Sequence, residues 1–347
     1  MDANPTEYTP ITLPTIDLSL FSSSKPQSTL LLNSLSTAAS TYGAFYVTSS
    51  SFTLSDEQAI ISATKEFFSL PKEVKESVYY RNGGFVRGYI PMGGESGSER
   101  TEMKEAFSYG YDWDNRDPPA SVLSPFSNSL EGHNQWGQLV DILGVKWKNV
   151  LTDYYAKMMQ ITKDCIKALE MAIGRDIQQP DKSGETISMI RLFHYFPHLN
   201  DGKMIGSSPH TDWGLLTLVL QPNSPRGLQI HYNNQWWDVP SKPGSFIVNC
   251  GDYLSLMTGG AVVSPLHRVV SDGESERYSL VFFYYPHYDT CLPSGQGSNL
   301  KLSLLMDQSV KYEGNDDDQK KNGTEGVTFG EYINRKWNQV ARGDYFV

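Results

Sequence analysis

The sequence predicts a mainly β protein with flanking helices, and two features carry this prediction. From residue 187 to residue 285 the chain is a series of short apolar segments separated by turn residues. Before residue 174, apolar residues instead recur mostly at helical spacing. Many short strands with turns at this spacing are typical of a closed or two-sheet β architecture. No internal repeat or linker divides the 347 residues, so we expect a single unit.

The N-terminal part is expected to be mostly helical, with strands at its edges. Apolar residues recur at helical spacing in residues 27–41 and, at greater length, in residues 136–173, where Gly174 fits the helix end. Ser55 and the two acidic residues after it supply a cap for a third helix, which we expect to run to about Phe68. Shorter elements complete this part: strands over residues 13–18, 43–47 and 107–110, and a helix that starts at residues 71–73.

The strand-forming part of the chain contains one clear hairpin. Residues 227–232 and 235–239 have strand character and flank Asn233-Asn234, a pair that favours a tight turn. The apolar stretch at residues 215–220 is typical of a strand buried on both faces. Further strands are expected over residues 187–197, 243–252, 267–270 and 277–285, and a last helix over residues 328–341.

His210 and Asp212 stand two positions apart, directly before this buried strand. If they continue its extended backbone, their side chains point to the same face, because strand residues alternate. An imidazole and a carboxylate on one face form half of a metal site. One more histidine would complete the facial triad of two histidines and one carboxylate that binds iron(II). Taken alone, the pair is better explained as a capped turn before a strand.

A second block supplies the missing groups. His267 lies 55 positions after Asp212 and precedes another apolar pair. Ten positions further on, Arg277 and Ser279 open a strand and are again two positions apart, so they share a face. A guanidinium beside a hydroxyl suits a carboxylate ligand. The remaining histidines are interpreted as non-ligands: His133, His194, His198, His231 and His287.

In this order and at this spacing, His-x-Asp, a distal His and Arg-x-Ser resemble the iron(II)/2-oxoglutarate-dependent dioxygenase superfamily. The branch concerned includes isopenicillin N synthase and plant flavonoid and gibberellin oxidases. The resemblance covers nearly the whole chain, because residues 13–18 and Lys104-Glu105-Ala106-Phe107 also resemble segments of the family. It narrows the expected fold to a double-stranded β-helix, or jelly roll, with helices on one side.

The resemblance also implies how the chain is divided. Residues 1–347 would be a single catalytic unit. Its three parts would be a mostly helical N-terminal part with edge strands (1–185), a jelly-roll core that carries the iron site (186–290), and a C-terminal extension with a polar loop and a final helix (291–347). The Gly- and Ser-rich residues 92–98 are expected to form a flexible lid or substrate loop.

The resemblance implies that His210, Asp212 and His267 bind iron(II), with 2-oxoglutarate and dioxygen as co-substrates. The enzyme would oxidise an unactivated C–H bond of a small organic molecule and release succinate and carbon dioxide. Hydroxylation, desaturation and ring formation are all compatible with such a site, and secondary metabolism is the expected setting.

Further residues take roles through the same resemblance. Arg277 would pair with the far carboxylate of 2-oxoglutarate, Ser279 would donate a hydrogen bond, and Tyr195 would lie near the co-substrate. The alternative for Arg277 is a surface salt bridge with Glu274 or Glu276. Candidate substrate contacts, for whose aromatic members core packing is an equal alternative, are Arg87, Phe107, Trp213, Phe283 and Tyr285.

Three alternative functions remain open at this point. An iron oxidase of the isopenicillin N synthase or aminocyclopropanecarboxylate oxidase type uses no 2-oxoglutarate, and Arg277 and Ser279 predict a carboxylate without saying whose it is. Ethylene formation from 2-oxoglutarate is a variant, since Gly251-Asp252 and residues 257–260 resemble the bacterial ethylene-forming enzyme. A jelly roll that only binds its ligand is the third.

Composition excludes other classes. A net charge of −10 argues against a nucleic-acid surface. No apolar run approaches transmembrane length, and the first residues lack the basic and apolar regions of a secretory signal. Three widely spaced cysteines indicate a reducing compartment and no disulfide framework. We therefore expect a cytoplasmic enzyme whose partner is a small molecule, with no nucleic-acid or membrane partner.

Overall fold

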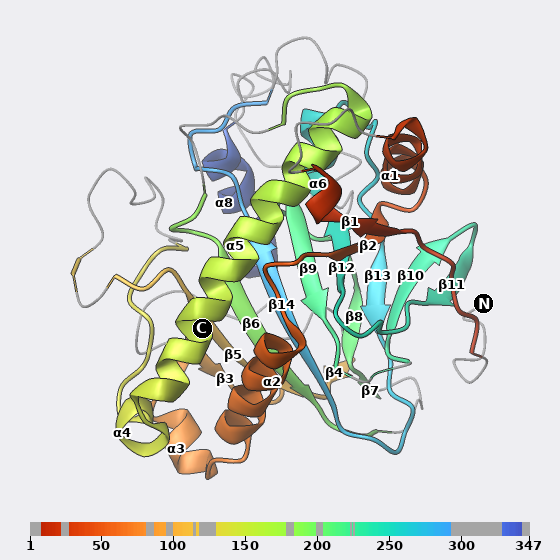
Figure 1. Cartoon of the computed structure of the whole chain (residues 1–347). Coiled ribbons are helices and arrows are strands. Elements are labelled where there is room, and N and C mark those ends of the chain that lie inside the picture. The colour runs from red at the N-terminus through yellow and green to blue at the C-terminus, as the bar shows by residue number, and fades with distance from the viewer. Residues whose placement is uncertain are drawn as a thin grey trace, which may run out of the picture.

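Two sheets face each other in the computed structural model of the chain, and helices cover the outer side of the larger sheet (Figure 1). The strand order is β1-β2-β12-β9-β14-β6-β5-β3 in the eight-stranded sheet and β11-β10-β13-β8 in the four-stranded sheet. The structure describes residues 8–21, 28–80, 87–94, 100–113, 116–117, 130–177, 184–198, 204–222, 224, 226–292 and 328–341.

From β6 onward, the chain winds between the two sheets. Strands in the large sheet are β6 (Met189–Tyr195), β9 (Leu216–Leu220), β12 (Phe246–Cys250) and β14 (Arg277–Tyr284). Strands in the small sheet are β8 (Ser207–His210), β10 (Leu228–Tyr232), β11 (Gln235–Asp238) and β13 (His267–Val269). This alternation is the winding of a double-stranded β-helix, so the predicted jelly-roll core is confirmed.

The N-terminal part adds strands to both edges of the large sheet. At one edge lie β1 (Thr15–Asp17) and β2 (Ala44–Thr48), and at the other lie β5 (Lys104–Gly110) and β3 (Gly88–Ile90). A separate parallel pair joins β4 (Thr101–Glu102) to β7 (Met204–Ile205). The division of the chain into three parts stays a prediction, and the proposed lid at 92–98 lies mostly outside the described residues, as does the polar loop near 313–325.

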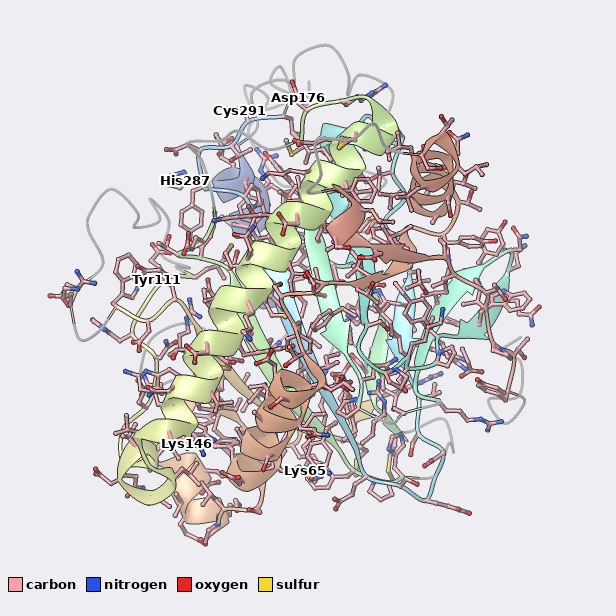
Figure 2. All side chains as sticks on the ribbon, viewed as in Figure 1. Lys65, Tyr111, Lys146, Asp176, His287 and Cys291 are labelled. Atoms are coloured by element: carbon pink, nitrogen blue, oxygen red, sulfur yellow. The ribbon has the colours of Figure 1, made fainter. Side chains whose placement is uncertain are left out.

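Helices pack on the large sheet because each presents one apolar face. The long helix α5 (Val145–Ile173) contacts β9 and β14, and α1 (Thr29–Thr41) and α2 (Leu54–Phe68) pack beside it (Figure 1). Exposed polar side chains, among them Lys146 and Lys65, lie on these helices as well (Figure 2). The remaining elements are the 3-10 helix Leu18–Phe21 and the helices α3 (Lys72–Glu76), α4 (Leu139–Leu143), α6 (Asp252–Met257) and α8 (Phe329–Ala341).

The structure corrects two local predictions and adds one helix. The helix predicted over residues 136–173 is broken at Gly144, whose φ of 86° is not helical, and this gives α4 and α5. The cap of α2 is Thr53, two residues earlier than predicted, in a reciprocal capping box with Asp56. The helix α6 was not predicted, because its residues follow a strand and are too few to show helical periodicity. Within the described residues, no helix is long and apolar enough to cross a membrane.

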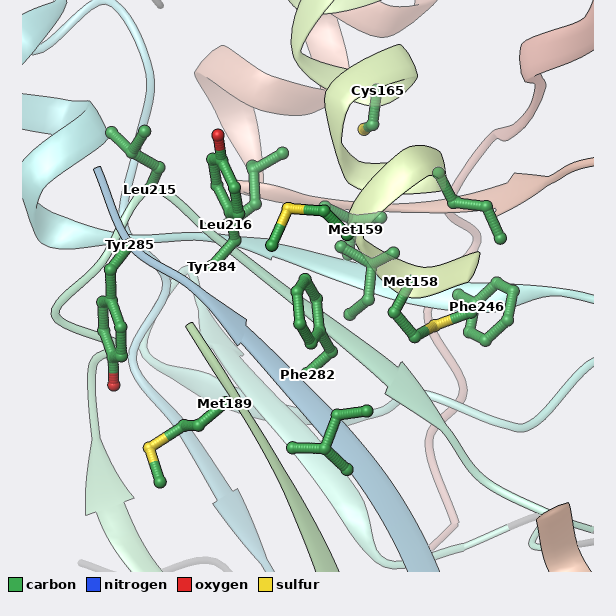
Figure 3. Packing of buried hydrophobic residues seen from close by; sticks show 14 of the residues in the cluster. Met158, Met159, Cys165, Met189, Leu215, Leu216, Phe246, Phe282, Tyr284 and Tyr285 are labelled. Carbon is green, nitrogen blue, oxygen red and sulfur yellow. The ribbon is translucent and has the colours of Figure 1, made fainter. Parts of the chain in front are cut away.

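Two apolar clusters lie on opposite sides of the large sheet. The larger cluster joins the sheet to the helices, and Met158 and Met159 of α5 meet Phe246 and Phe282 there (Figure 3). The smaller cluster lies between the two sheets and includes Tyr195. The hairpin of β10 and β11 is also as predicted: Asn233 and Asn234 have φ of 48° and 59°, the left-handed values that a tight type I′ turn requires.

Candidate active site

The three predicted iron ligands converge between the ends of neighbouring strands. His210 is the last residue of β8, Asp212 lies in the segment that follows, and His267 opens β13 directly opposite His210. Asp212 Oδ1 lies 3.9 Å from His210 Nε2 and 3.7 Å from His267 Nε2. The three ligand atoms lie within 4.8 Å of one another, and no other such group of three occurs in the described part of the chain.

The backbone reaches this arrangement by a different route from the one expected. His210 and Asp212 do not continue one extended strand, because the chain leaves the small sheet at His210 and enters the large sheet at Leu216. Gly214 allows this crossover: a Cβ there would lie 2.6 Å from the carbonyl oxygen of Tyr284. The crossover, and not strand alternation, brings the carboxylate back towards the imidazoles.

Backbone carbonyls orient both imidazoles. His210 Nδ1 donates a hydrogen bond to the carbonyl oxygen of Ser208 at 2.7 Å, and His267 Nδ1 donates to that of Pro265 at 3.1 Å. A carbonyl only accepts, so Nδ1 carries the hydrogen and each Nε2 presents a lone pair. Both lone pairs belong to the atoms that approach Asp212, as in metal sites whose histidines are held by outer partners.

The donor set fits a divalent metal ion. Asp212 is 5% exposed, and its Oδ2 is buried with no hydrogen-bond partner in the part of the chain that the structure describes. A buried carboxylate oxygen without a partner is unfavourable, and a bound cation would satisfy it. Loss of hydration and the adjacent His267 lower the pKa of His210, which keeps Nε2 unprotonated at neutral pH although 43% of the side chain is accessible. Two imidazoles and one carboxylate are the iron(II) set that leaves positions open.

The residues predicted to bind a carboxylate also meet. Arg277 Cζ lies 5.0 Å from the centre of the Tyr195 ring, and Ser279 Oγ lies 3.4 Å from the Tyr195 hydroxyl. The guanidinium donates through Nε to Ser224 Oγ at 2.9 Å and through Nη2 to Gln221 Oε1, while Nη1 is buried without a partner among the described residues. A half-buried guanidinium, a buried hydroxyl and a buried phenol are therefore grouped in one place.

The salt-bridge alternative for Arg277 is not found. In the described part of the chain Arg277 forms no ion pair with Glu274 or Glu276, and Glu276 lies 3.5 Å from His194 Nε2 instead. The partners Gln221 and Ser224 were not predicted. Gln221 is a buried amide directly after an apolar strand, which is the one local signal that points to it.

Gly227 makes room for the Arg277 side chain. Its φ is 125°, and a Cβ there would lie 2.5 Å from Arg277 Nε. Any larger residue would push the guanidinium away from Gln221 and Ser224. Burial lowers the pKa of Arg277 from its usual value. A guanidinium nevertheless stays charged in proteins.

The predicted substrate contacts do not all lie at the site. The structure does not bring Phe107 there: it is fully buried on the helix-covered side, with its ring 4.4 Å from that of Phe67. Lys104 and Ala106 face the other way, because strand residues alternate. Phe283 packs against the cluster between the sheets as well as the larger one, and half-buried Trp213 directly follows Asp212 in the chain.

Tyr285 lies in the interior near Asp212, whereas Arg87 lies deeper, beside Leu130 and Gly110. Tyr285 follows β14, and a Cβ on Gly214 would lie 2.8 Å from its ring. Burial, with the negative charge of Asp212, raises the pKa of Tyr285, so the phenol is protonated. Arg87 is fully buried; its Nη2 donates to the carbonyl oxygen of Leu130 at 2.8 Å, while Nε and Nη1 have no hydrogen-bond partner among the described residues.

His194, one of the histidines predicted not to bind the metal, belongs to a network on the helix-covered side. Its Nδ1 lies 2.9 Å from Glu105 Oε1, and its ring stacks on Tyr278 at 4.7 Å. The same carboxylate pairs with Lys75 Nζ at 2.8 Å and accepts from the Tyr89 hydroxyl at 2.6 Å. The other histidines outside the ligand group are His133, His198, His231 and His287.

Fold and site together define a non-haem iron oxygenase, and comparisons with known proteins agree. The family model of the 2OG-Fe(II) oxygenase superfamily matches residues 186–286, and the model of the non-haem dioxygenase N-terminal region in morphine synthesis matches residues 13–138. A 2-oxoglutarate-dependent dioxygenase of Didymella fabae is 33% identical over 285 residues, which cover 78% of this chain and 84% of that protein. The 2-oxoglutarate-dependent dioxygenase citB of Monascus ruber is 29% identical over 290 residues (80% and 85%).

Solved structures share the fold. A full-length Neurospora crassa protein in complex with alpha-KG superposes with a TM-score of 0.72 at 21% identity, covering 97% of this chain and 99% of that one. A putative 2OG-Fe(II) oxygenase family protein from Caulobacter crescentus gives 0.71 at 22% identity (94% and 99%). The chain belongs to the 2OG-Fe(II) oxygenase superfamily. It is an oxidoreductase that uses Fe(II), 2-oxoglutarate and dioxygen, and the alternatives without 2-oxoglutarate are not favoured.

Proposed function

We propose that this oxygenase oxidises an unactivated C–H bond of a small organic molecule in secondary metabolism, with His210, Asp212 and His267 as its iron ligands. The observation that carries the ligand assignment is the convergence of the three ligand atoms within 4.8 Å. Secondary metabolism is supported by the fungal relatives. One of these is the clavatol oxidase claD of Penicillium crustosum, 28% identical over 324 residues that cover 86% of this chain and 93% of that protein.

Iron(II) and 2-oxoglutarate, when bound, supply the oxidising chemistry: dioxygen is reduced while 2-oxoglutarate is converted to succinate and carbon dioxide. The residues of the chain bind the metal and the co-substrate and orient them. His210, Asp212 and His267 would hold the metal, and a set of two histidines and one carboxylate leaves coordination positions open for other ligands. The carbonyl oxygens of Ser208 and Pro265 keep both imidazoles in the tautomer that can coordinate.

Arg277 binds the far carboxylate of 2-oxoglutarate in this proposal. Its Nε and Nη2 are held by Ser224 and Gln221, so the guanidinium plane is set before the ligand arrives, and Nη1 is left to donate. Ser279 of the same strand and Tyr195 of the neighbouring strand β6 add neutral donors. Because these two residues are buried, water competes little with the carboxylate there.

Four of the predicted contacts would line the substrate site in this proposal. Phe283 and Trp213 would pack against its apolar part, while Tyr285 would offer a phenol and Arg87 guanidinium nitrogens that have no partner among the described residues. We also propose a cytoplasmic location without nucleic-acid or membrane partners. The buried Cys165 and Cys250 and the exposed Cys291 are all free thiols, which suits a reducing compartment.

The test is anaerobic addition of iron(II) and 2-oxoglutarate to the purified protein, followed by the visible charge-transfer band of the chelate. The wild type is expected to show the band. His267→Ala is expected to lose both iron binding and the band, whereas His231→Ala, in the adjacent strand of the same sheet, keeps both. Arg277→Ala is expected to keep iron but to weaken 2-oxoglutarate binding by about 100-fold, because a buried charged pair loses one partner.

Two outcomes would contradict the assignment. A band of normal strength in His267→Ala would remove that residue from the ligand set. A band of normal strength and normal 2-oxoglutarate affinity in Arg277→Ala would mean that Arg277 serves another carboxylate.

A further inference from the structure

Asp252 is a buried carboxylate at the first residue of α6, and it accepts hydrogen bonds from three separate parts of the chain. It is 0% exposed. Ser264 Oγ donates to Oδ1 at 2.7 Å. Thr211 Oγ1, Tyr332 Oη and Lys336 Nζ all lie near Oδ2, at 3.1, 3.2 and 3.3 Å. The carboxylate is thus well satisfied within the protein, unlike that of a metal ligand.

The first of these parts carries two iron ligands. Thr211 stands between His210 and Asp212 in the chain, so its bond to Asp252 holds the middle of the ligand segment. The backbone N–H of Asp252 donates to the carbonyl oxygen of Asp212 at 2.7 Å. Gly251 lets α6 approach this closely, because a Cβ there would clash with the carbonyl oxygen of Gly214. Asp252 therefore holds the ligand segment with both its side chain and its backbone.

The second part carries the remaining ligand. Ser264 directly precedes Pro265, whose carbonyl oxygen accepts the hydrogen bond from His267 Nδ1. Through Ser264, Asp252 fixes the peptide that sets the rotation of the His267 ring. One carboxylate thus restrains the segments of all three ligands without touching the metal site itself.

The third part is the C-terminal helix α8. Tyr332 and Lys336 are four residues apart, so they project from one face of the helix. Lys336 forms an ion pair with Asp252, and the two side chains are 10% and 0% exposed. Phe329 of the same helix packs on the rings of Tyr253 and Tyr285, at 5.1 and 5.6 Å between ring centres. The helix is docked on α6 and on the residue that follows β14.

We propose that Asp252 is a positioning residue through which the docking of α8 controls iron(II) affinity. Lys336 is the cation paired with this buried carboxylate, and its loss would leave Asp252 with neutral hydrogen-bond partners only, which is unfavourable in the interior. When α8 is displaced, Asp252 must find other partners, and the hydrogen bonds that restrain Thr211 and Ser264 change with it. The proposal rests on the proposed ligand set.

The decisive variant is Lys336→Met, which removes the cation and keeps most of the apolar stem. The readout is the iron(II) dissociation constant of the protein, measured anaerobically by competition with a chelator, with no turnover involved. We expect affinity to fall about tenfold or more, the range found for partners that orient metal ligands. Arg335→Met is the matched control, since Arg335 is the neighbouring cation on α8 and has no contact with Asp252 among the described residues.

A double-mutant cycle separates coupling from simple loss of stability. Asp252→Asn keeps the shape and removes the charge, so Lys336→Met is expected to have almost no further effect in that background. Tyr332→Phe, a milder change that removes one hydrogen bond, is expected to lower iron(II) affinity a few-fold and serves if Lys336→Met does not fold.

Unchanged iron(II) affinity in Lys336→Met and Tyr332→Phe, with a lower melting temperature, would overturn the proposal and leave the cluster as a structural ion pair. Equal, additive losses in the cycle would also overturn it. If the wild type bound no iron(II), the proposed ligand set itself would be wrong. If iron(II) binding were lost in His267→Ala but not in Lys336→Met, only the role of Asp252 would be wrong.

Discussion

Buried charged groups on the two sides of the large sheet differ in how fully the chain itself supplies their hydrogen-bond and ion-pair partners. On the helix-covered side, Glu105 is paired with Lys75 and His194 and hydrogen-bonded to Tyr89, so its oxygens have partners within the chain. On the side that faces the small sheet, Asp212 Oδ2 and Arg277 Nη1 are buried and have no hydrogen-bond partner among the described residues. A desolvated charged group that lacks hydrogen-bond partners is unfavourable unless a ligand supplies them.

The difference teaches where to look for chemistry in this fold. Along β14, Leu280 and Phe282 join the helix-covered core, while Arg277 and Ser279 face the interior between the sheets. A single strand therefore serves stability with one set of residues and ligand binding with the other. Mutations in the first set should therefore lower stability, and mutations in the second set should weaken ligand binding.

The largest effect on stability is expected from Phe107→Ala. Phe107 is fully buried against Phe67 and the helices, so its removal should lower the free energy of unfolding by about 3–5 kcal/mol. Chemical denaturation measures this change. Iron(II) affinity of the folded variant should equal that of the wild type, measured well below the melting temperature. A marked loss of iron(II) or substrate binding in the folded variant would contradict this distinction and would support the predicted role of Phe107 as a substrate contact.

Glu102 gives a further test of this comparison, because it is a paired buried charge close in the fold to the proposed metal ligand His210. Burial raises its pKa, but Lys104 at 2.6 Å and the N–H of Ser208 at 2.7 Å outweigh this and lower the pKa to about 2. A carboxyl group whose pKa is lowered by folding stabilises the protein above its unfolded pKa, and this stability is lost as the pH falls through the folded pKa.

The expected loss is about 3 kcal/mol between a pH of about 4.5 and a pH of about 2, from the difference of the two pKa values. Urea denaturation of the metal-free protein across this range is the measurement, with Glu102→Gln as the comparison. The variant should be less stable at neutral pH, and the gap should narrow as the pH falls. A gap that stays constant with pH would mean that the charge of Glu102 contributes no stability.

The smallest effect is expected from Ser279→Ala. Loss of one neutral hydrogen bond should weaken 2-oxoglutarate binding by about 1 kcal/mol, or roughly fivefold, with little change in stability. Titration of the chelate band measures it, and Ser275→Ala, in the exposed turn before β14, is the matched control. Equal binding in both variants would remove Ser279 from the carboxylate site.

Features that depend on residue type and short spacing could be predicted from the sequence. The order and spacing of His210, Asp212, His267 and Arg277 singled out the groups that the fold brings together. The Asn233-Asn234 turn and the Gly174 helix end were also predicted, because each depends on the backbone preferences of one or two residues. Alternation showed that Arg277 and Ser279 share a face, which follows from the period of a strand alone.

Other features were decided only by the tertiary structure. Alternation separates Phe107 from Lys104, but it does not say which set faces the helices; that depends on how β5 joins the sheet. His210 and Asp212 meet because the chain crosses between sheets at Gly214, and Arg277 meets Gln221 because distant strands pair in one register. Asp252 gathers Thr211, Ser264 and Lys336 from positions up to 84 residues away, and no local pattern encodes such contacts. Sequence periodicity describes each element singly, whereas these contacts depend on the packing of several elements together.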